Sequence, residues 1–220
     1  FYQADGSTIR FMTVAYLDPV HPVDISDQYS GQDHPMRVVT REVAFDNTWD
    51  AERRATVRGV FDGLAEEWAA TRSNPERMVP LEDALCRGEV QGTIALELGA
   101  GTGIATQVLQ NHFSTVATVD LSPEMLFRAP KAALRVCADA QQLPFADDAA
   151  DVLVLMNMLL FPAEVDRCLA PGGALVWVNS RSGDTPIHLP AEDVVTALPG
   201  RWQAVASFSG SASWCVVRRF

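Results

Sequence analysis

The stretch Thr93–Gly103, Thr-Ile-Ala-Leu-Glu-Leu-Gly-Ala-Gly-Thr-Gly, constrains the fold of this chain more than any other feature. Ile94–Leu98 places apolar residues on both faces of a strand, which is typical of a parallel strand covered by helices. The three glycines then allow a tight turn and a close approach of backbone to ligand, at the start of a helix expected from Ile104. The stretch therefore predicts a strand, a ligand-binding loop and a helix in succession.

The glycine spacing narrows the type of ligand. It is Gly-x-Gly-x-Gly, with Glu97 two residues before the first glycine. Dinucleotide-binding domains instead carry Gly-x-Gly-x-x-Gly, whose glycines serve a pyrophosphate at the helix N-terminus. For this stretch alone, a glycine-rich turn without a ligand is the alternative.

Apolar strand-like runs alternate with short helical segments along the rest of the chain. Further strands are predicted at 115–119, 133–138, 151–156 and 174–178, with helices at 104–111, from 123, at 162–169 and at 191–198, and with a terminal hairpin of 202–208 and 213–218. The alternation predicts right-handed βαβ units. The expected fold is α/β, a Rossmann-like, doubly wound, mostly parallel seven-stranded sheet with an antiparallel terminal hairpin and helices on both faces.

The chain before this sheet divides into two segments. Residues 1–46 contain two β-branched-rich runs, 8–16 and 36–45, which predict a β-rich arm or hairpin. Residues 47–90 are helical in pattern and are expected to form a lid or cap, which leaves 91–220 as the ligand-binding domain. A short helix is expected at 80–85, between a proline and a glycine.

An apolar stripe marks the long helix predicted in residues 47–90. Val57, Phe61, Leu64 and Trp68 recur at helical spacing over about 25 residues. Such a stripe is more typical of core packing than of a cofactor site.

Composition excludes several classes of function. A net charge of −11 without a basic stripe argues against a nucleic-acid partner. The four cysteines are scattered and no His/Cys ligand spacing occurs, which argues against a zinc site and a disulfide framework and favours a cytoplasmic protein. No run approaches about 20 apolar residues, so no membrane span is expected.

Two acids follow the next two strands, at the edge of the sheet where ligands bind in such folds. Asp120, about 20 residues after the glycine turn, could accept hydrogen bonds from two ribose hydroxyls. Asp139, with the N–H of Ala140, would suit the edge of an adenine. The alternative is that each aspartate only caps the next turn.

Four motifs in this order resemble those of class I S-adenosylmethionine-dependent methyltransferases, in particular the small-molecule group that includes the ubiquinone and menaquinone biosynthesis enzymes. The motifs are Glu97–Gly103, Val119–Leu126, Ala138–Phe145 and Leu169–Val176, and the resemblance covers about residues 90–220. It implies S-adenosyl-L-methionine as cofactor and S-adenosyl-L-homocysteine as product.

The resemblance also implies a role for each motif residue. The glycine loop would bend around the methionine part of the cofactor, braced by Glu97, while Asp120 would hold the ribose. Leu121 would flank the adenine, Asp139 and Ala140 would read its edge, and the residues after the fourth strand of the domain would line the sulfonium end. The implied cofactor-binding set is Glu97, Gly99, Ala100, Gly101, Gly103, Asp120, Leu121, Asp139, Ala140, Met156 and Asn157.

The methyl acceptor has two candidate locations, the N-terminal lid and the loop 179–188. The loop offers Arg181, Asp184 and His188, and His188 is the best candidate for a catalytic base, although a loop histidine is more often only solvated or hydrogen-bonded. No Asp/Glu/His cluster suggests a metal. Asn157–Leu160 departs from the Asn/Asp-Pro-Pro-aromatic motif of enzymes that methylate the amino groups of nucleic-acid bases.

We therefore expect a methyltransferase that acts on an O, N or C atom of a small metabolite by in-line displacement, with a homodimer as a compatible assembly. A non-catalytic S-adenosylmethionine-binding protein with a regulatory or assembly role is the alternative. A nicotinamide dehydrogenase ranks third, because the glycine spacing is wrong for it.

Overall fold

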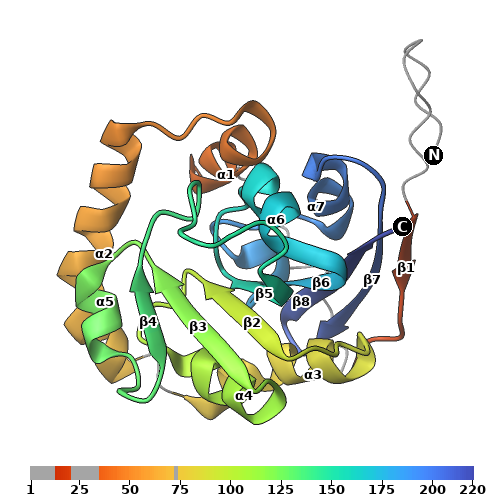
Figure 1. Ribbon diagram of the computed structural model, residues 1–220, viewed down its shortest axis with the longest axis horizontal. Helices are drawn as coiled ribbons and strands as arrows, with labels where there is room; N and C mark the ends of the chain where they lie inside the picture. Colours follow the sequence, from red (N-terminus) through yellow and green to blue (C-terminus); the bar gives the residue numbers. More distant parts are fainter. Residues whose placement is uncertain (1–12, 21–34, 72–73) are drawn as a thin grey trace.

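The fold is built on one twisted sheet. The computed structural model describes residues 13–20, 35–71 and 74–220, and these form an eight-stranded sheet in the order β1-β7-β8-β6-β5-β2-β3-β4 (Figure 1). Every neighbouring pair is parallel except that β8 runs antiparallel to β6 and β7. The strands are β1 (Thr13–Tyr16), β2 (Ile94–Leu98), β3 (Thr115–Asp120), β4 (Leu134–Cys137), β5 (Ala150–Met156), β6 (Leu169–Asn179), β7 (Trp202–Ser209) and β8 (Ala212–Arg219).

Helices cover both faces of the sheet, as Figure 1 shows. Side chains that alternate along β5 divide between the two cores: Leu153 and Leu155 pack with α1, α6 and α7, whereas Val152 and Val154 pack with α3 and α4. α2 lies beside α5 at the β4 end of the sheet. The helices are α1 (Pro35–Asp46), α2 (Ala51–Thr71), α3 (Val79–Arg87), α4 (Ile104–His112), α5 (Pro123–Arg128), α6 (Pro162–Cys168) and α7 (Ala191–Ala197), with short 3-10 turns η1 (Pro75–Met78) and η2 (Ser182–Asp184).

The predicted α/β fold is confirmed, and local signals explain several boundaries. Ser122 is the N-cap of α5, where its hydroxyl accepts a hydrogen bond from the Met125 N–H at 3.1 Å, and Pro123 opens the helix. α3 ends at Arg87, immediately before Gly88. The terminal hairpin also forms as expected, with β8 inserted antiparallel beside β6.

The strand predicted at 36–45 is wrong, because this segment is the helix α1. Its valines and threonine favour a strand locally, but Met36, Val39 with Thr40, and Val43 with Ala44 recur every three to four residues and turn toward the core. Tertiary packing therefore outweighs β-propensity here.

The other strand of the predicted hairpin also has a different partner. Residues 8–12 lie outside the described residues, and Thr13–Tyr16 forms β1, which pairs parallel with β7 at the edge of the sheet. β1 thus adds an eighth strand to the seven expected. Residues 170–173, which separate the predicted helix 162–169 from the predicted strand 174–178, belong to β6, where the pairing with β5 shifts register.

Only part of the apolar stripe of α2 packs against the core as predicted, since Val57 contacts the core cluster. Ala65 is the buried residue of this helix, while Phe61 and Leu64 are each 37% exposed. Trp68, at the other end of the stripe, is half-buried and lies beside the glycine loop at the carboxyl end of β2.

Candidate functional site

The glycine loop after β2 is held in shape by the end of β3. The Ala100 N–H donates to the Val119 carbonyl at 3.0 Å, and the Gly101 N–H donates to Oδ2 of Asp120 at 2.7 Å. Both N–H groups therefore donate hydrogen bonds within the chain. All three glycines have left-handed backbone conformations, with φ of 68° at Gly99, 57° at Gly101 and 74° at Gly103.

The three glycines differ in what surrounds them. A Cβ atom at Gly103 would lie 2.6 Å from Cδ of Pro130 and 3.1 Å from Cβ of Ala129, so this position is closed by rigid neighbours. At Gly101 the nearest atom would be Nε1 of Trp68 at 3.7 Å. A side chain would therefore overlap its neighbours at Gly103, where α4 begins, whereas a Cβ at Gly101 would make only van der Waals contact with Trp68.

Glu97 is buried at the end of β2, with 3% of its surface exposed. Its carboxyl group accepts a hydrogen bond from the hydroxyl of Thr106 on α4. The Thr106 hydroxyl oxygen also lies 3.2 Å from the Thr118 hydroxyl oxygen on β3. Burial raises the pKa of Glu97 to about 8, despite the Thr106 hydrogen bond, which acts in the opposite direction. Glu97 therefore joins the sheet to the helix that follows the glycine loop.

Asp120 connects the glycine loop to the start of α5. Besides the Gly101 N–H, its carboxylate accepts the Ser122 N–H at 2.8 Å. Burial raises the pKa of Asp120, and the backbone N–H groups partly offset this rise. A carboxylate has about four lone-pair directions, so Asp120 retains acceptor capacity beyond these two bonds.

Asp139, at the end of β4, contacts the segment that leads into α2. Nε1 of Trp49 lies 3.1 Å from both carboxylate oxygens, and Nη1 of Arg54 lies 2.9 Å from Oδ2. The Gln141 N–H donates to Oδ1 at 2.9 Å. The carboxylate that the resemblance assigns to the adenine edge thus already has three donors, and the neighbouring Ala140 is buried in the core.

The segment 49–68 reaches every one of these loops. Besides Trp49 and Arg54 at Asp139, Asp62 accepts a hydrogen bond from the Ser122 hydroxyl at 2.5 Å, and Trp68 stands over Gly101. A cavity of about 330 Å³ separates α2 from Leu121. Sequence reasoning missed Trp49, Arg54 and Asp62; the helical stripe ending at Trp68 was the available signal, and it was interpreted as core packing.

Asn157 joins the end of β5 to the loop after β6. Its backbone has a φ of 52°, and its amide exchanges two hydrogen bonds of 2.9 Å with Ser180, one to the hydroxyl and one from the N–H. The preceding Met156 is half-buried and pairs with Val178 on β6. The residues expected at the sulfonium end therefore fix the position of the neighbouring loop.

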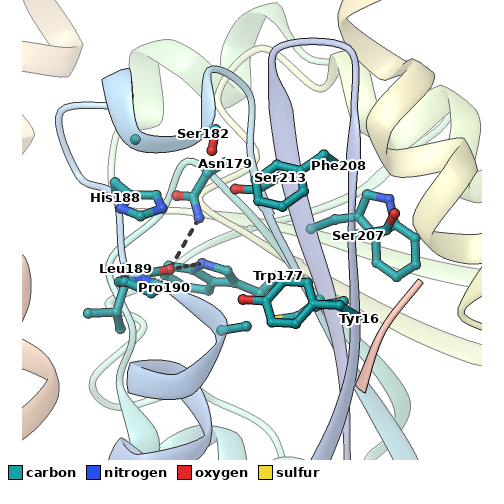
Figure 2. Close-up of a pocket in the computed structure, with 15 residues that line it drawn as sticks. Tyr16, Trp177, Asn179, Ser182, His188, Leu189, Pro190, Ser207, Phe208 and Ser213 are labelled. Carbon is teal, nitrogen blue, oxygen red and sulfur yellow. Dashed lines mark hydrogen bonds between the residues drawn. The ribbon is translucent and has the colours of Figure 1, made fainter. Parts of the chain in front are cut away.

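A second cavity, of about 170 Å³, lies at the carboxyl end of β6, between the sheet and the start of α7 (Figure 2). Of the three acceptor-loop residues named from the sequence, His188 lines this cavity, whereas Arg181 and Asp184 are exposed and do not. Burial, and to a lesser extent the charge of Arg37, lowers the pKa of His188 to about 4. At neutral pH its imidazole is an uncharged hydrogen-bonding group and a weak base.

Two expected absences concern metals and membranes. Within residues 13–20, 35–71 and 74–220, no group of three or more His, Cys, Asp or Glu side chains could hold a metal ion. None of the helices in these ranges has the length and apolar character needed to cross a bilayer.

Comparisons with known proteins agree with the geometry. The methyltransferase domain family matches residues 96–177. The demethylmenaquinone methyltransferase of Mycobacterium marinum is 36% identical over 169 residues, which cover 69% of this chain and 71% of that protein. The malonyl-[acyl-carrier protein] O-methyltransferase of Halorhodospira halophila is 35% identical over 155 residues, which cover 60% of this chain and 51% of that protein. The chain thus spans about half the length of the malonyl-[acyl-carrier protein] O-methyltransferases that it matches.

A solved structure supports the fold independently. The DhpI complex with S-adenosylhomocysteine superimposes with a TM-score of 0.55 over 73% of this chain and 94% of that one, at 22% identity. Together with the four sequence motifs and the extent of the match to the Mycobacterium relative, these findings show that the chain belongs to the class I S-adenosylmethionine-dependent methyltransferases, in their quinone-biosynthesis-like group.

Proposed function

We propose that this chain transfers a methyl group from S-adenosylmethionine to an O, N or C atom of a small-molecule metabolite. The observation that carries the proposal is the convergence of the glycine loop, Asp120 and Asp139 at one edge of the sheet beneath α2. The relatives named as a malonyl-[acyl-carrier protein] O-methyltransferase and a demethylmenaquinone methyltransferase support a metabolite-type acceptor.

The residues present suit this cofactor. At Gly101 an added Cβ would make only van der Waals contact with Trp68, and Asp120 keeps lone pairs that could accept ribose hydroxyls. The cavity of about 330 Å³ beside Leu121 provides room for a flat ring next to the ribose position. Asp139 could accept the exocyclic amine of an adenine once one of its present donors gives way.

Each cofactor-binding residue has a proposed place in this arrangement. Glu97 and the loop residues Gly99, Ala100, Gly101 and Gly103 support the methionine end, and Asp120 with Leu121 supports the ribose and one face of the base. Asp139 and Ala140 lie at the adenine edge, and Met156 and Asn157 at the sulfonium end. When bound, S-adenosylmethionine would supply an electrophilic methyl group. A nucleophile of the acceptor would bond to the methyl carbon in line with the breaking carbon–sulfur bond, and S-adenosylhomocysteine would leave.

The chain's own contribution is to position the acceptor and to exclude water. We propose that residues 47–90 act as a lid over the cofactor and 91–220 as the catalytic domain, which the contacts of Asp62, Trp68 and Arg54 support. His188 would contact the acceptor as a neutral hydrogen-bonding group, because a group with a pKa of about 4 is a poor match for removing a proton from a weak acid.

Two further features complete the proposal. The net charge of −11 supports an acceptor other than a nucleic acid. The four cysteines are free thiols, which supports a reducing, cytoplasmic location.

Calorimetric titration with S-adenosylhomocysteine tests the proposal. We expect micromolar binding by the wild type, and a loss of about tenfold or more in affinity for Asp120→Ala, because charge-assisted hydrogen bonds to the ribose disappear. Glu82→Ala, which removes an exposed acid on α3, is the matched control and should bind like the wild type. An absence of heat with both S-adenosylmethionine and S-adenosylhomocysteine would contradict the proposal. In a second experiment, transfer of a labelled methyl group to any component of a metabolite extract would rule out the non-catalytic alternative.

A further inference from the structure

The side-chain amide of Asn179 lines the cavity beside α7 and contains a buried acceptor atom without a donor. Its side chain is 2% exposed, and its Oδ1 atom has no hydrogen-bond partner among the residues that the structure describes. Burying an acceptor without a donor is costly, and natural proteins rarely do so without a reason. An acceptor that faces a cavity and lacks a donor therefore indicates a ligand that supplies one.

The orientation of this amide follows from its surroundings. Its Nδ2 atom donates to the Leu189 carbonyl at 3.3 Å, and the same carbonyl accepts the indole N–H of Trp177 at 3.1 Å. Rotating the amide by 180° would set Oδ1 against a carbonyl oxygen, so the oxygen must face away from Leu189. In Figure 2 the oxygen lies on the His188 side of the amide, opposite the two dashed hydrogen bonds.

The remaining lining is uncharged and mostly apolar. Trp177, Tyr16 and Phe208 form apolar walls, and no Asp, Glu, Lys or Arg is among the described lining residues. The Tyr16 hydroxyl donates to Glu192 at 2.9 Å, which directs its polar end away from a ligand. The imidazole of His188 is uncharged at neutral pH, and burial raises the pKa of the Cys215 thiol, so this group is also uncharged.

The volume and the position of the cavity further limit which ligands it can hold. The cavity measures about 170 Å³, and an apolar cavity of about 150 Å³ holds a benzene ring. β6 pairs with β5 at Met156 and Val178, and neighbouring strands lie about 4.8 Å apart. The cavity at the end of β6 is therefore close to Met156 and Asn157, where the proposed function places the methyl donor.

We propose that this cavity is the acceptor site, and that it takes a neutral planar ring whose hydroxyl or N–H group donates a hydrogen bond to Oδ1 of Asn179. This inference rests on the proposed function and adds to it the chemical class of the acceptor. An anionic acceptor would have no charged partner among the residues that line the cavity. Arg37, whose charge acts on His188, is not in this lining, and its guanidinium donates to the Gly183 carbonyl.

Fragment binding followed by nuclear magnetic resonance tests the site. The probes are phenol, fluorobenzene, which has nearly the same shape without a donor, and benzoate, which carries a charge. We expect phenol to shift the indole N–H signals of Trp177 and Trp214, which line the cavity, and to leave that of Trp202, which does not. Wild-type protein should bind phenol several-fold more tightly than fluorobenzene, and benzoate most weakly.

Asn179→Leu should weaken phenol binding about tenfold and leave fluorobenzene binding nearly unchanged, because only phenol loses a partner. Gln203→Leu, which changes an exposed amide on β7, is the matched control and should behave like the wild type. If Asn179→Leu does not fold, the order of affinities of the three probes for the wild-type protein still tests the inference.

Equal binding of phenol and fluorobenzene, a preference for benzoate, or shifts at Trp202 instead of Trp177 would each overturn the inference. Titration of the same wild-type sample with S-adenosylhomocysteine separates the two proposals. Cofactor binding without phenol shifts at Trp177 refutes the acceptor site alone, whereas an absence of cofactor binding refutes the proposed function.

Discussion

The two halves of the ligand-binding edge are built on opposite electrostatic principles. On the half formed by β2, β3 and β4, three carboxylates are present, and each accepts hydrogen bonds from the chain itself. On the half formed by β6, β7 and β8, the cavity has a neutral lining and contains a buried acceptor without a donor. The first half has the character of a site for a polar, hydroxyl-rich cofactor and the second that of a site for a neutral ring. The predictions below test this contrast.

The largest effect is expected from the glycine loop of the cofactor half. Gly103→Ala should lower the free energy of unfolding by about 2–5 kcal/mol, because it combines left-handed strain with overlap against Pro130. The variant should also lose binding of S-adenosylhomocysteine. Denaturant unfolding and calorimetry measure both quantities.

Gly172→Ala provides the control, since Gly172 has a φ of 79° but no atom within 4 Å of an added Cβ. It should cost only the strain, about 1–2 kcal/mol, and leave cofactor binding intact. Equal losses in the two variants would contradict the proposed packing around Gly103.

The next effect concerns the pH dependence of stability. The pKa of Glu97 is raised to about 8 in the folded chain, so its contribution is fully present below its unfolded pKa and is lost as the pH rises through 8. Between pH 5 and 8 the free energy of unfolding should fall by up to roughly 1.4 kcal/mol per pH unit. Glu97→Gln should give a flatter curve in denaturant titrations, and Glu82→Gln should follow the wild type. Parallel curves for all three proteins would show that Glu97 ionises normally.

A smaller effect is expected at Asp139. Trp49→Phe removes the indole donor that faces both carboxylate oxygens. If the adenine amine uses the same carboxylate, this donor competes with the cofactor, and the variant should bind S-adenosylhomocysteine about threefold more tightly. Weaker binding in calorimetry would instead identify Trp49 as a residue that supports the cofactor.

The smallest effect belongs to the acceptor half. The His188 imidazole should remain neutral from pH 8 down to pH 5, because its pKa lies at about 4. Its folded pKa is depressed, so its contribution to stability is present above about pH 6.5 and is lost as the pH falls toward 4. Ring nitrogen chemical shifts measure this directly, and a midpoint near 6.5 would show that the site is solvated.

The contrast between the halves also explains what the sequence could predict. The cofactor half is encoded locally: each acid lies at or just beyond the carboxyl end of its own strand, so Glu97, Asp120 and Asp139 could be placed at one edge from the alternation of strands and helices alone. The parallel sheet and the terminal hairpin were predictable for the same reason. α1 was not, because its valines favour a strand unless the core they contact is known.

The acceptor half is assembled from distant segments. Tyr16, Asn179, Phe208 and Ser213 meet only because β1, β7, β8 and β6 are neighbours in the sheet. His188 could be named from its loop, but the missing donor at Asn179 is a property of packing that no local pattern carries. The contacts of Trp49 and Arg54 with Asp139 are likewise long-range.

A crossed titration tests the division of the edge most directly. S-adenosylhomocysteine and phenol are titrated separately into wild-type, Asp120→Ala and Asn179→Leu protein. We predict that Asp120→Ala loses affinity for S-adenosylhomocysteine but retains phenol binding, and that Asn179→Leu does the reverse. Two outcomes would contradict the presence of two separate sites on this edge. One is that a variant with an unchanged melting temperature loses binding of both ligands, and the other is that neither variant loses binding of either ligand.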